Sequence, residues 1–442
     1  MARTEPRTGP ASWGACRRRR YAWLVTFSLL LLMMLNWADK AVLGIAAVPI
    51  MRELRLSPAE FGLLGSAMFG TFVLAQVFGA PVVNRVSAKW ALLVLCLLWS
   101  AAQLPVLLFA TAPALWAGRL LLGLGEGPLA PVMLHGIYKW FPEKKRATPG
   151  AVASAGVTLG IVAFSPVLAW LTTAYGWRAA FAILAAAGMA WAAYWVFFGK
   201  EGPYDGMESA GQPAERGTVP YSRTILNPTW LLALGTSFFG YWTFTLAMSW
   251  GPAYFQTVLG FSGQEAGVLI ALPSVWGTAA MIGLNALSQR LHGRGVPTRR
   301  SRAWLLGGGA IVSGSAVLAA VWVHSPTAAV ALLTIGFGTA PALFPLSLLI
   351  VTELTTAARR GANLSLANAA QTSAGLFAPA VSGVLIGSTT SAARGYPSAF
   401  ILAGALSLGM GVLCALFANQ QRDRRRLGLE TARVPAEPLS SI

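Results

Sequence analysis

Residues 21–48 read YAWLVTFSLLLLMMLNWADKAVLGIAAV. A run of this length can cross a hydrocarbon core of about 30 Å as a helix, because such a crossing needs about 20 mostly apolar residues. The run nevertheless contains Asp39 and Lys40. An ionisable side chain at bilayer depth costs roughly 2.5–3.5 kcal/mol on insertion scales. We therefore expect both residues to face a polar cavity and a partner rather than lipid.

Apolar runs of this kind recur along the whole chain. Of its 442 residues, 55% are hydrophobic and only 11% are charged, and the mean hydropathy is +0.60, a balance typical of an integral membrane protein. The first run is not read as a cleavable signal peptide, because it is long and carries charge. We predict an all-α membrane protein with twelve transmembrane helices, at residues 21–48, 60–83, 90–110, 113–138, 148–172, 178–199, 228–257, 265–289, 303–323, 326–353, 362–387 and 396–418.

The formal net charge is +18, and the clusters of basic residues fall in alternate loops and tails. By the positive-inside rule this places both termini in the cytoplasm, which requires an even number of spans. We expect a multi-pass protein of a bacterial-type inner (plasma) membrane. The basic clusters favour membrane lipids as partners rather than nucleic acid. They are Arg17 to Arg20, Arg85 with Lys89, Lys144 to Arg146, Arg290 to Arg302, Arg359 with Arg360, and Arg422 to Arg426.

A polar stretch from Lys200 to Arg223 divides the spans six and six. Its Gly, Pro, Glu and Arg content is typical of a linker. Two six-helix bundles with a site between them are a common plan for membrane transporters. The predicted parts are a cytoplasmic tail at 1–20, a bundle at 21–199, a cytoplasmic linker at 200–227, a second bundle at 228–418 and a cytoplasmic tail at 419–442.

The sequence shows no arrangement of residues typical of an enzyme active site. Its three cysteines lack paired spacing, so neither a disulfide framework nor a zinc site is indicated, and there is no phosphate-binding G-x-x-x-x-G-K-[ST] loop. The glycines of Gly123–Gly127 lie within an apolar span, where close helix packing explains them better than a dinucleotide loop. We therefore expect that the protein is not an enzyme and that it binds neither a metal nor a cofactor. Protons are expected as the coupling ion.

The fourth apolar run carries Arg119 and Glu126. At 100° per residue, these two residues and Met133 lie within about 20° of one line along a helix. Arg119 and Glu126 are about 10 Å apart along the axis, too far for a direct pair, so each needs partners on other helices. In the first run, Asn36 and Lys40 share a face at i,i+4 while Asp39 points elsewhere.

Two carboxylates and two cations at bilayer depth permit a cavity in which the charged groups change ion-pair partners as protons and an anion bind and leave. Desolvation favours protonated carboxylates, whereas a nearby cation favours the charged form. Protonation of a carboxylate would release its cation to bind an anion. The alternative is a fixed lattice of ion pairs that only aligns the helices.

These residues carry a family resemblance over nearly the whole chain. The stretch Asn36–Lys40 resembles the Asn-Tyr-x-Asp-Arg motif of the anion:cation symporters in the major facilitator superfamily, and Arg119–Pro128 resembles their fourth-helix Arg-x6-Glu segment. Trp140–Glu143 and Gly176–Arg178 fit that family too. The resemblance implies proton-coupled movement of organic anions. It assigns proton coupling to Asp39 and Glu126 and the substrate carboxylate to Lys40.

The chain also departs from that pattern. Lys40 stands where the family usually has Arg. The planar, forked guanidinium of Arg is thus replaced by the point charge of a lysine ammonium. The superfamily's loop motif after the second span has Asn84 in place of Asp. The charged contact by which this motif holds a closed state is therefore in doubt. Sugar-acid members of the family have polar or tyrosyl groups at the positions of Phe72, Met133 and Val157. A site without such groups discriminates less for hydroxyls, so we expect an aromatic or weakly hydroxylated carboxylate. Simple packing is an equal alternative for these positions.

In the second half, Tyr241, Trp242, Gln371 and Thr372 are predicted to line the pocket. Aromatic residues near helix ends are otherwise typical interface anchors. With them, the predicted substrate-binding set is Asn36, Trp37, Lys40, Phe72, Arg119, Met133, Val157, Tyr241, Trp242, Gln371 and Thr372.

We therefore predict a secondary active transporter, acting as a monomer, that imports a small organic anion with protons by alternating access. One alternative is a proton-coupled antiporter that exports amphipathic compounds. That alternative has no use for Lys40 and Arg119 as substrate anchors. An alternative of another class is a transport-inactive ligand sensor, although its tails, about 20 residues each, carry no recognisable domain.

Overall fold

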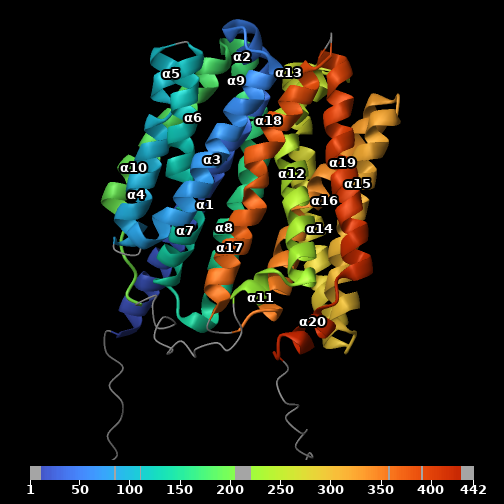
Figure 1. The fold of residues 1–442 in the computed structure, drawn as a ribbon. Coiled ribbons are helices and arrows are strands. Elements are labelled where there is room, and N and C mark those ends of the chain that lie inside the picture. The colour runs from blue at the N-terminus through green and yellow to red at the C-terminus, as the bar shows by residue number, and fades with distance from the viewer. Residues whose placement is uncertain are drawn as a thin grey trace, which may run out of the picture. The chain divides into compact units, whose positions relative to one another are not determined.

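The computed structural model describes residues 11–83, 86–109, 111–204, 221–356, 359–389 and 392–429, and the regular elements in these ranges are helices (Figure 1). Twelve spans in this part of the chain are long and apolar enough to cross a membrane, so the predicted number is confirmed. They are Arg18–Ile45, Pro58–Phe78, Ala88–Leu108, Ala112–Tyr138, Ala147–Tyr175, Trp177–Phe198, Pro228–Thr257, Gly263–Gly293, Arg299–Trp322, Pro326–Glu353, Arg360–Gly387 and Ala393–Phe417.

The helices of the first six spans and their connections are α1 Ala11–Ile45, α2 Ala47–Leu54, α3 Pro58–Val83, α4 Ala88–Ala101, α5 Leu104–Leu108, α6 Ala112–Glu126, α7 Leu129–Tyr138, η1 Glu143–Lys145, α8 Ala147–Ser154, α9 Gly156–Tyr175 and α10 Trp177–Phe198. Those that follow are α11 Tyr221–Ile225, α12 Pro228–Thr257, α13 Gly263–Leu269, α14 Ala271–Gly293, η3 Arg299–Ala303, α15 Trp304–Trp322, α16 Pro326–Glu353, α17 Arg360–Thr372, α18 Ala374–Gly387, α19 Ala392–Phe417 and α20 Gln420–Arg426.

Several spans are interrupted along their length. The fourth span changes from α6 to α7 at Gly127 and Pro128, whereas our projection treated it as one straight helix. Proline has no N–H to donate and its ring crowds the preceding turn. The Gly127 N–H still donates to the Gly123 carbonyl at 3.1 Å, so the break leaves little backbone unpaired in lipid. Its consequence is that Glu126 is the last residue of α6.

The chain divides into two compact units. The first unit contains residues 1–212, 245–275 and 375–399, and the second contains 213–244, 276–374 and 400–442. The end of α12, the start of the eighth span and most of α18 thus pack with the first six spans. The predicted linker at 200–227 lies largely outside the described residues, as do Asn84 and Arg85 of the loop motif, so both remain expectations.

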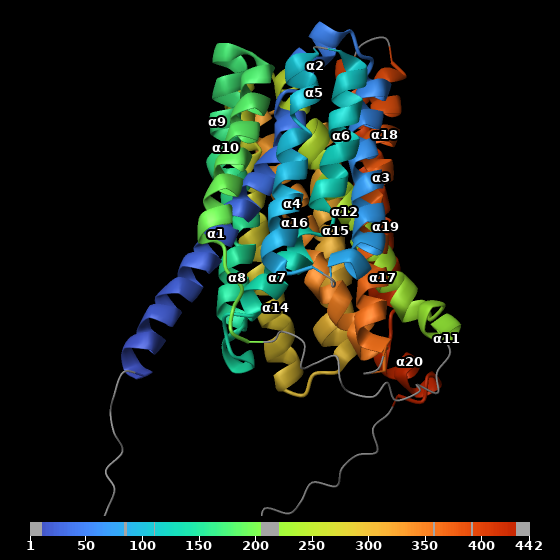
Figure 2. The same cartoon turned by 90° about the vertical axis from the view of Figure 1, so that its left-hand side faces the viewer.

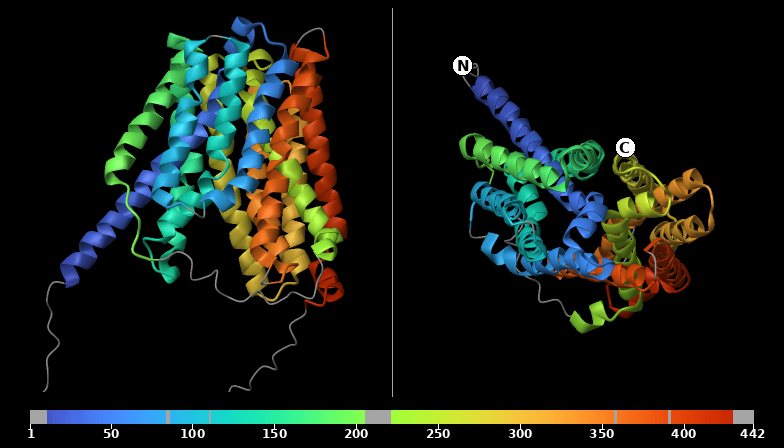
Figure 3. Two further views of the ribbon diagram at one scale, coloured as in Figure 1. Left: turned by 60° about the vertical axis from the view of Figure 1, so that its left-hand side comes forward. Right: turned by 90° about the horizontal axis from the view of Figure 1, so that it is seen from above.

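Each unit has its own apolar core. That of the first unit gathers Leu29, Cys96, Trp99 and Ile137 from α1, α4 and α7. That of the second unit gathers Ala310, Leu343 and Cys414 from α15, α16 and α19. Figures 2 and 3 show a further feature of the first unit, in which the first turns of α1 lean away from the neighbouring helices.

Helix packing within the first unit relies on glycine. A Cβ atom on Gly62 of α3 would collide with the Pro379 carbonyl oxygen of α18 and would lie 3.1 Å from the Gly383 Cα. Small residues allow such close backbone approach, which matters because lipid supplies no hydrophobic force between helices. The Ala380 N–H also donates to Ser66 Oγ at 3.0 Å. Glycine, proline and one hydroxyl therefore hold α3 against α18.

Candidate functional site

The Lys40 ammonium is the centre of the charged site in the first unit. Its Nζ donates to Asn36 Oδ1 at 2.7 Å, one helical turn earlier on α1, as their spacing predicts. It also forms an ion pair with the Glu126 carboxylate at the end of α6. The Lys40 side chain is 8% exposed and that of Glu126 is fully buried. Two residues 86 positions apart are thus joined in a site largely removed from water.

Two aromatic rings enclose the same ammonium. Lys40 Nζ lies 5.1 Å from the ring centre of Trp37 and 5.6 Å from that of Phe72 on α3. A cation within about 6 Å of an aromatic face is attracted by the ring quadrupole, and more strongly where water is absent. The rings stabilise Lys40 as a cation but offer no oxygen acceptor. Phe72 comes close because Gly123 lets α6 approach α3, where a Cβ would collide with Thr71 and Met68.

Asp39 points to a different neighbour. Gln103 Nε2 donates to Asp39 Oδ1 at 2.7 Å, and both residues are buried. Gln103 lies in the turn between α4 and α5. Our sequence reasoning missed this residue, although a lone amide within an apolar span is a signal of function. Asp39 also feels the charges of Glu126, Arg119 and Lys40, so the four ionisable groups form one electrostatic cluster.

Arg119 is the least satisfied member of this cluster. Its side chain on α6 is 2% exposed, and its guanidinium carbon lies 5.3 Å from the ring centre of Phe181 on α10. Nη1 and Nη2 have no hydrogen-bond partner among the described residues. A buried cation without hydrogen bonds is costly unless something satisfies it. The guanidinium therefore has donors available for an anion or for water.

Met133 and Val157 lie among apolar side chains. Met133 on α7 is 1% exposed and belongs to the core cluster of the first unit. Val157 on α9 packs against that cluster and is partly exposed. Their predicted contact with substrate remains untested.

The predicted residues of the second half lie in the second unit. Tyr241 on α12 packs against Phe344 of α16 with ring centres 5.3 Å apart, and the next residue, Trp242, is 7% exposed. Gln371 on α17 donates to Asn368 Oδ1 at 2.9 Å, and the Thr372 hydroxyl donates to the Asn368 carbonyl at 2.9 Å. The four residues thus form two local groups, and their part in substrate binding stays a prediction.

Comparison with known proteins yields consistent similarities. Residues 29–379 and 298–442 match the sequence model of the family described as the Major Facilitator Superfamily. The probable sulfoacetate transporter SauU of Cupriavidus necator is 27% identical over 408 residues, which cover 88% of this chain and 92% of that protein. The hexuronate transporter of Bacillus subtilis is 29% identical over 269 residues, which cover 59% of this chain and 62% of that protein.

A similar fold is found among solved structures. A bacterial homologue of the human lysosomal transporter Spinster, in an inward-facing and unoccupied conformation, matches with a TM-score of 0.77 at 20% identity. The match covers 91% of this chain and 98% of that chain.

Proposed function

Because the chain belongs to the Major Facilitator Superfamily, we propose that it is a secondary active transporter that imports a small, weakly hydroxylated organic anion together with protons. Membership of this superfamily confirms the twelve-helix fold and a transporter rather than an enzyme. The anion, the coupling ion and the direction of transport are proposals. The charged site and the relatives support them.

The buried Lys40–Glu126 pair is the observation that carries the proposal. Separating such a pair without replacement costs about 3–5 kcal/mol, because one buried charge is left uncompensated. A proton on Glu126 and a carboxylate on Lys40 would together replace the pair. The net charge of the pair is zero before the exchange, and it is zero again with one proton and one monoanionic carboxylate bound. Binding of the anion therefore favours uptake of a proton, and this reciprocity is the basis of coupling.

The surroundings of Lys40 support the choice of anion. Its walls are the rings of Trp37 and Phe72, which give apolar contact and no hydroxyl partner. The relatives are named as a probable transporter of sulfoacetate, which has no hydroxyl group, and a transporter of hexuronates, which have several. The ring-lined site favours the less hydroxylated type, because buried groups that pair with hydroxyls are what select polyhydroxy acids. The free donors of Arg119 suit a second anionic group.

We further propose that the protein lies in an inner membrane with both termini in the cytoplasm. The support is the alternation of basic loops along the sequence. Fusion of a reporter that is active only in the cytoplasm to each terminus tests this topology.

The test of function is a thermal-shift screen followed by uptake into proteoliposomes with an imposed pH gradient. The panel contains sulfoacetate, benzoate-type acids, short dicarboxylates, gluconate, galactonate and hydrophobic cations, each at low and neutral pH. Ligands stabilise the folded protein by mass action, so the binding class appears as a raised melting temperature. We expect stabilisation by the small acids, stronger at low pH, followed by uptake driven by an inward proton gradient.

The matched variants are Lys40→Ala and Lys40→Arg. We expect Lys40→Ala to abolish anion stabilisation, since loss of one partner of a buried charge pair typically costs 2–5 kcal/mol. Lys40→Arg keeps the charge and should retain binding of carboxylates. Better competition by gluconate or galactonate than by the small acids would refute the proposed substrate class. Stabilisation by hydrophobic cations alone would replace import of an anion by antiport.

A further inference from the structure

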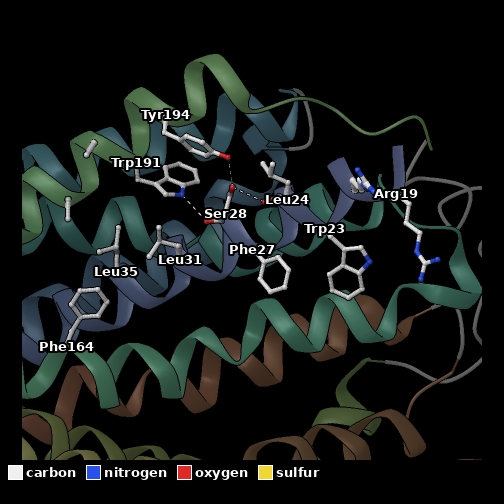
Figure 4. Close-up of a pocket in the computed structure, with 13 residues that line it drawn as sticks. Arg19, Trp23, Leu24, Phe27, Ser28, Leu31, Leu35, Phe164, Trp191 and Tyr194 are labelled. Carbon is white, nitrogen blue, oxygen red and sulfur yellow. Dashed lines mark hydrogen bonds between the residues drawn. The ribbon is translucent and has the colours of Figure 1, made fainter. Parts of the chain in front are cut away.

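A wide groove of the first unit lies apart from the charged site. It is a groove of about 1180 Å³ along α1, bounded by Phe164 of α9 and by Trp191 and Tyr194 of α10. Figure 4 shows Arg19 and Trp23 at one end of the groove and Leu35 with Phe164 at the other. Leu24, Phe27 and Leu31 are 44%, 55% and 45% exposed along it. Beyond the basic end of the groove, the first turns of α1 lean away from the neighbouring helices (Figure 2).

The floor of the groove has its polar groups already paired. The Ser28 hydroxyl donates to the Leu24 carbonyl at 2.9 Å and lies 3.1 Å from the Tyr194 hydroxyl. Trp191 Nε1 donates to the Ser28 carbonyl at 2.9 Å. A polar solute would find few partners here. An alkyl chain needs none, so the interior of the groove suits a hydrocarbon.

One end of the groove is strongly cationic. Arg19 and Arg20 line it, and Arg19 and Trp23 also line a neighbouring cavity of about 810 Å³ that includes Arg18, Lys144 and Lys145. No carboxylate is among the described residues that line either cavity. None of these five cations forms an ion pair with a described carboxylate. The positive charge at this end is therefore available to an anionic ligand.

We propose that this groove is a binding site for one anionic phospholipid of the surrounding leaflet. Its phosphate lies between Arg19 and Arg20, with the lysines of the neighbouring cavity adding positive potential. One acyl chain follows Phe27 and Leu31 toward Phe164. Basic pockets between membrane helices are suited to anionic headgroups in this way.

The dimensions of the groove fit a single leaflet. From Arg20 to Leu35 the helix rises about 22 Å at 1.5 Å per residue. Half of a bilayer measures about 20–22 Å when its headgroup region is included. The basic end thus lies at headgroup level when Leu35 lies near the middle of the bilayer. A lipid in the groove would reach from the membrane surface to the residue that precedes Asn36 of the charged site.

Charge, and not the apolar wall, should decide which lipid binds. Lipid tails are as apolar as leucine, so moving a chain from the bilayer into the groove gains little free energy. Each Lys or Arg near the surface strengthens the binding of an anionic lipid. The groove positions the chain, and the arginines select the headgroup. The preference should therefore be for phosphatidylglycerol over phosphatidylcholine with identical chains.

Native mass spectrometry of the full chain, released from nanodiscs of mixed phosphatidylglycerol and phosphatidylcholine, tests the proposal. We expect one phosphatidylglycerol to be retained by the natural protein. The double variant Arg19→Gln/Arg20→Gln should reduce this preference about tenfold or more. Arg19→Lys/Arg20→Lys should retain most of it, which separates loss of charge from misfolding.

Two matched controls sharpen the result. Arg290→Gln/Arg294→Gln removes two exposed cations from another basic loop and should leave retention unchanged. Ala190→Trp places an indole in the groove, whereas Ala193→Trp alters an exposed alanine of α10 that does not line it, so only the first should weaken retention. Equal loss in both arginine pairs, equal retention of phosphatidylcholine, or equal effects of the two tryptophans would overturn the proposal.

Discussion

Asp39 and Lys40 are adjacent on α1, yet their side chains pair with different helices. Asp39 accepts a hydrogen bond from Gln103 between α4 and α5, whereas Lys40 forms an ion pair with Glu126 at the end of α6. Successive helical residues point about 100° apart, so one turn of α1 meets both neighbours. The site therefore contains two carboxylates in unlike surroundings, one beside an amide and one beside a cation. Unlike surroundings give two carboxylates different roles.

The first prediction concerns coupling at Glu126. Glu126→Gln should remove the proton dependence of anion affinity, which amounts to about 5- to 150-fold in typical coupled sites, while exchange of bound anion is partly kept. The measurement is anion affinity by thermal shift at low and neutral pH, together with counterflow in proteoliposomes. Glu143→Gln, in the exposed turn η1, serves as the control. Equal loss of binding and exchange in Glu126→Gln would instead indicate a structural residue.

The second prediction concerns the amide that sequence reasoning missed. Gln103→Leu should destabilise the protein by about 1–3 kcal/mol, because the buried Asp39 carboxylate loses its donor. The pair Asp39→Leu/Gln103→Leu should cost less than the sum of the two single changes. Unfolding of the four proteins in a double-mutant cycle gives this coupling energy. Strict additivity would show that the hydrogen bond contributes nothing.

The third prediction concerns Arg119. Arg119→Lys keeps a cation but loses the planar fork that binds two oxygens at once. We expect a rise in KM for dianions such as sulfoacetate and a smaller change for monocarboxylates. Competition assays with the two classes in one preparation measure the ratio directly. A uniform change for both classes would leave Arg119 with a structural role beside Phe181.

The fourth prediction concerns the glycine contact of α3 with α18. Gly62→Ala places a Cβ against the Pro379 carbonyl and should cost about 1–3 kcal/mol through overpacking. Gly283→Ala in α14 has no neighbouring atom within 4 Å of the added Cβ and should stabilise by about 0.4–1 kcal/mol. Thermal unfolding of both variants gives the comparison. Gly62→Ala as stable as Gly283→Ala would contradict the close approach.

The fifth prediction concerns pH and Glu201, outside the spans. Burial alone would raise the pKa of this carboxyl, but hydrogen bonds from Lys139 Nζ at 2.8 Å and the Lys89 N–H at 2.7 Å leave the pKa lowered. A lowered folded-state pKa means that the stabilisation is present above the unfolded pKa of about 4.3 and is lost as pH falls through the folded value.

We therefore expect Glu201→Gln to lower the free energy of unfolding at pH 7 by at most about 1 kcal/mol, because the pair is partly exposed. The difference from the natural protein should vanish at low pH. Melting temperatures across the acid range check both statements. A difference that grows toward acid pH would contradict the sign of the shift.

The sequence by itself determined the spans and the local geometry of α1. The spans are helical because every peptide group in lipid must be paired. Their apolar length follows from the thickness of the bilayer, and the rarity of charge within them follows from its cost in lipid. The Asn36–Lys40 hydrogen bond follows from the 3.6-residue turn, which needs no tertiary information. These features were predictable because each arises from residues within a few positions of one another.

Tertiary structure alone decided which partners the buried charges have. Glu126 lies 86 positions from Lys40, and Gln103 lies 64 positions from Asp39, so neither pairing can be read from helical periodicity. The break at Gly127 and Pro128 and the glycine approach of α6 to α3 set these distances. The groove beside α1 likewise depends on tertiary structure, because its lining residues come from α1, α9 and α10. The composition of a helix determines that it spans the membrane. Its partners depend on side-chain packing between helices, because lipid supplies no hydrophobic force between them.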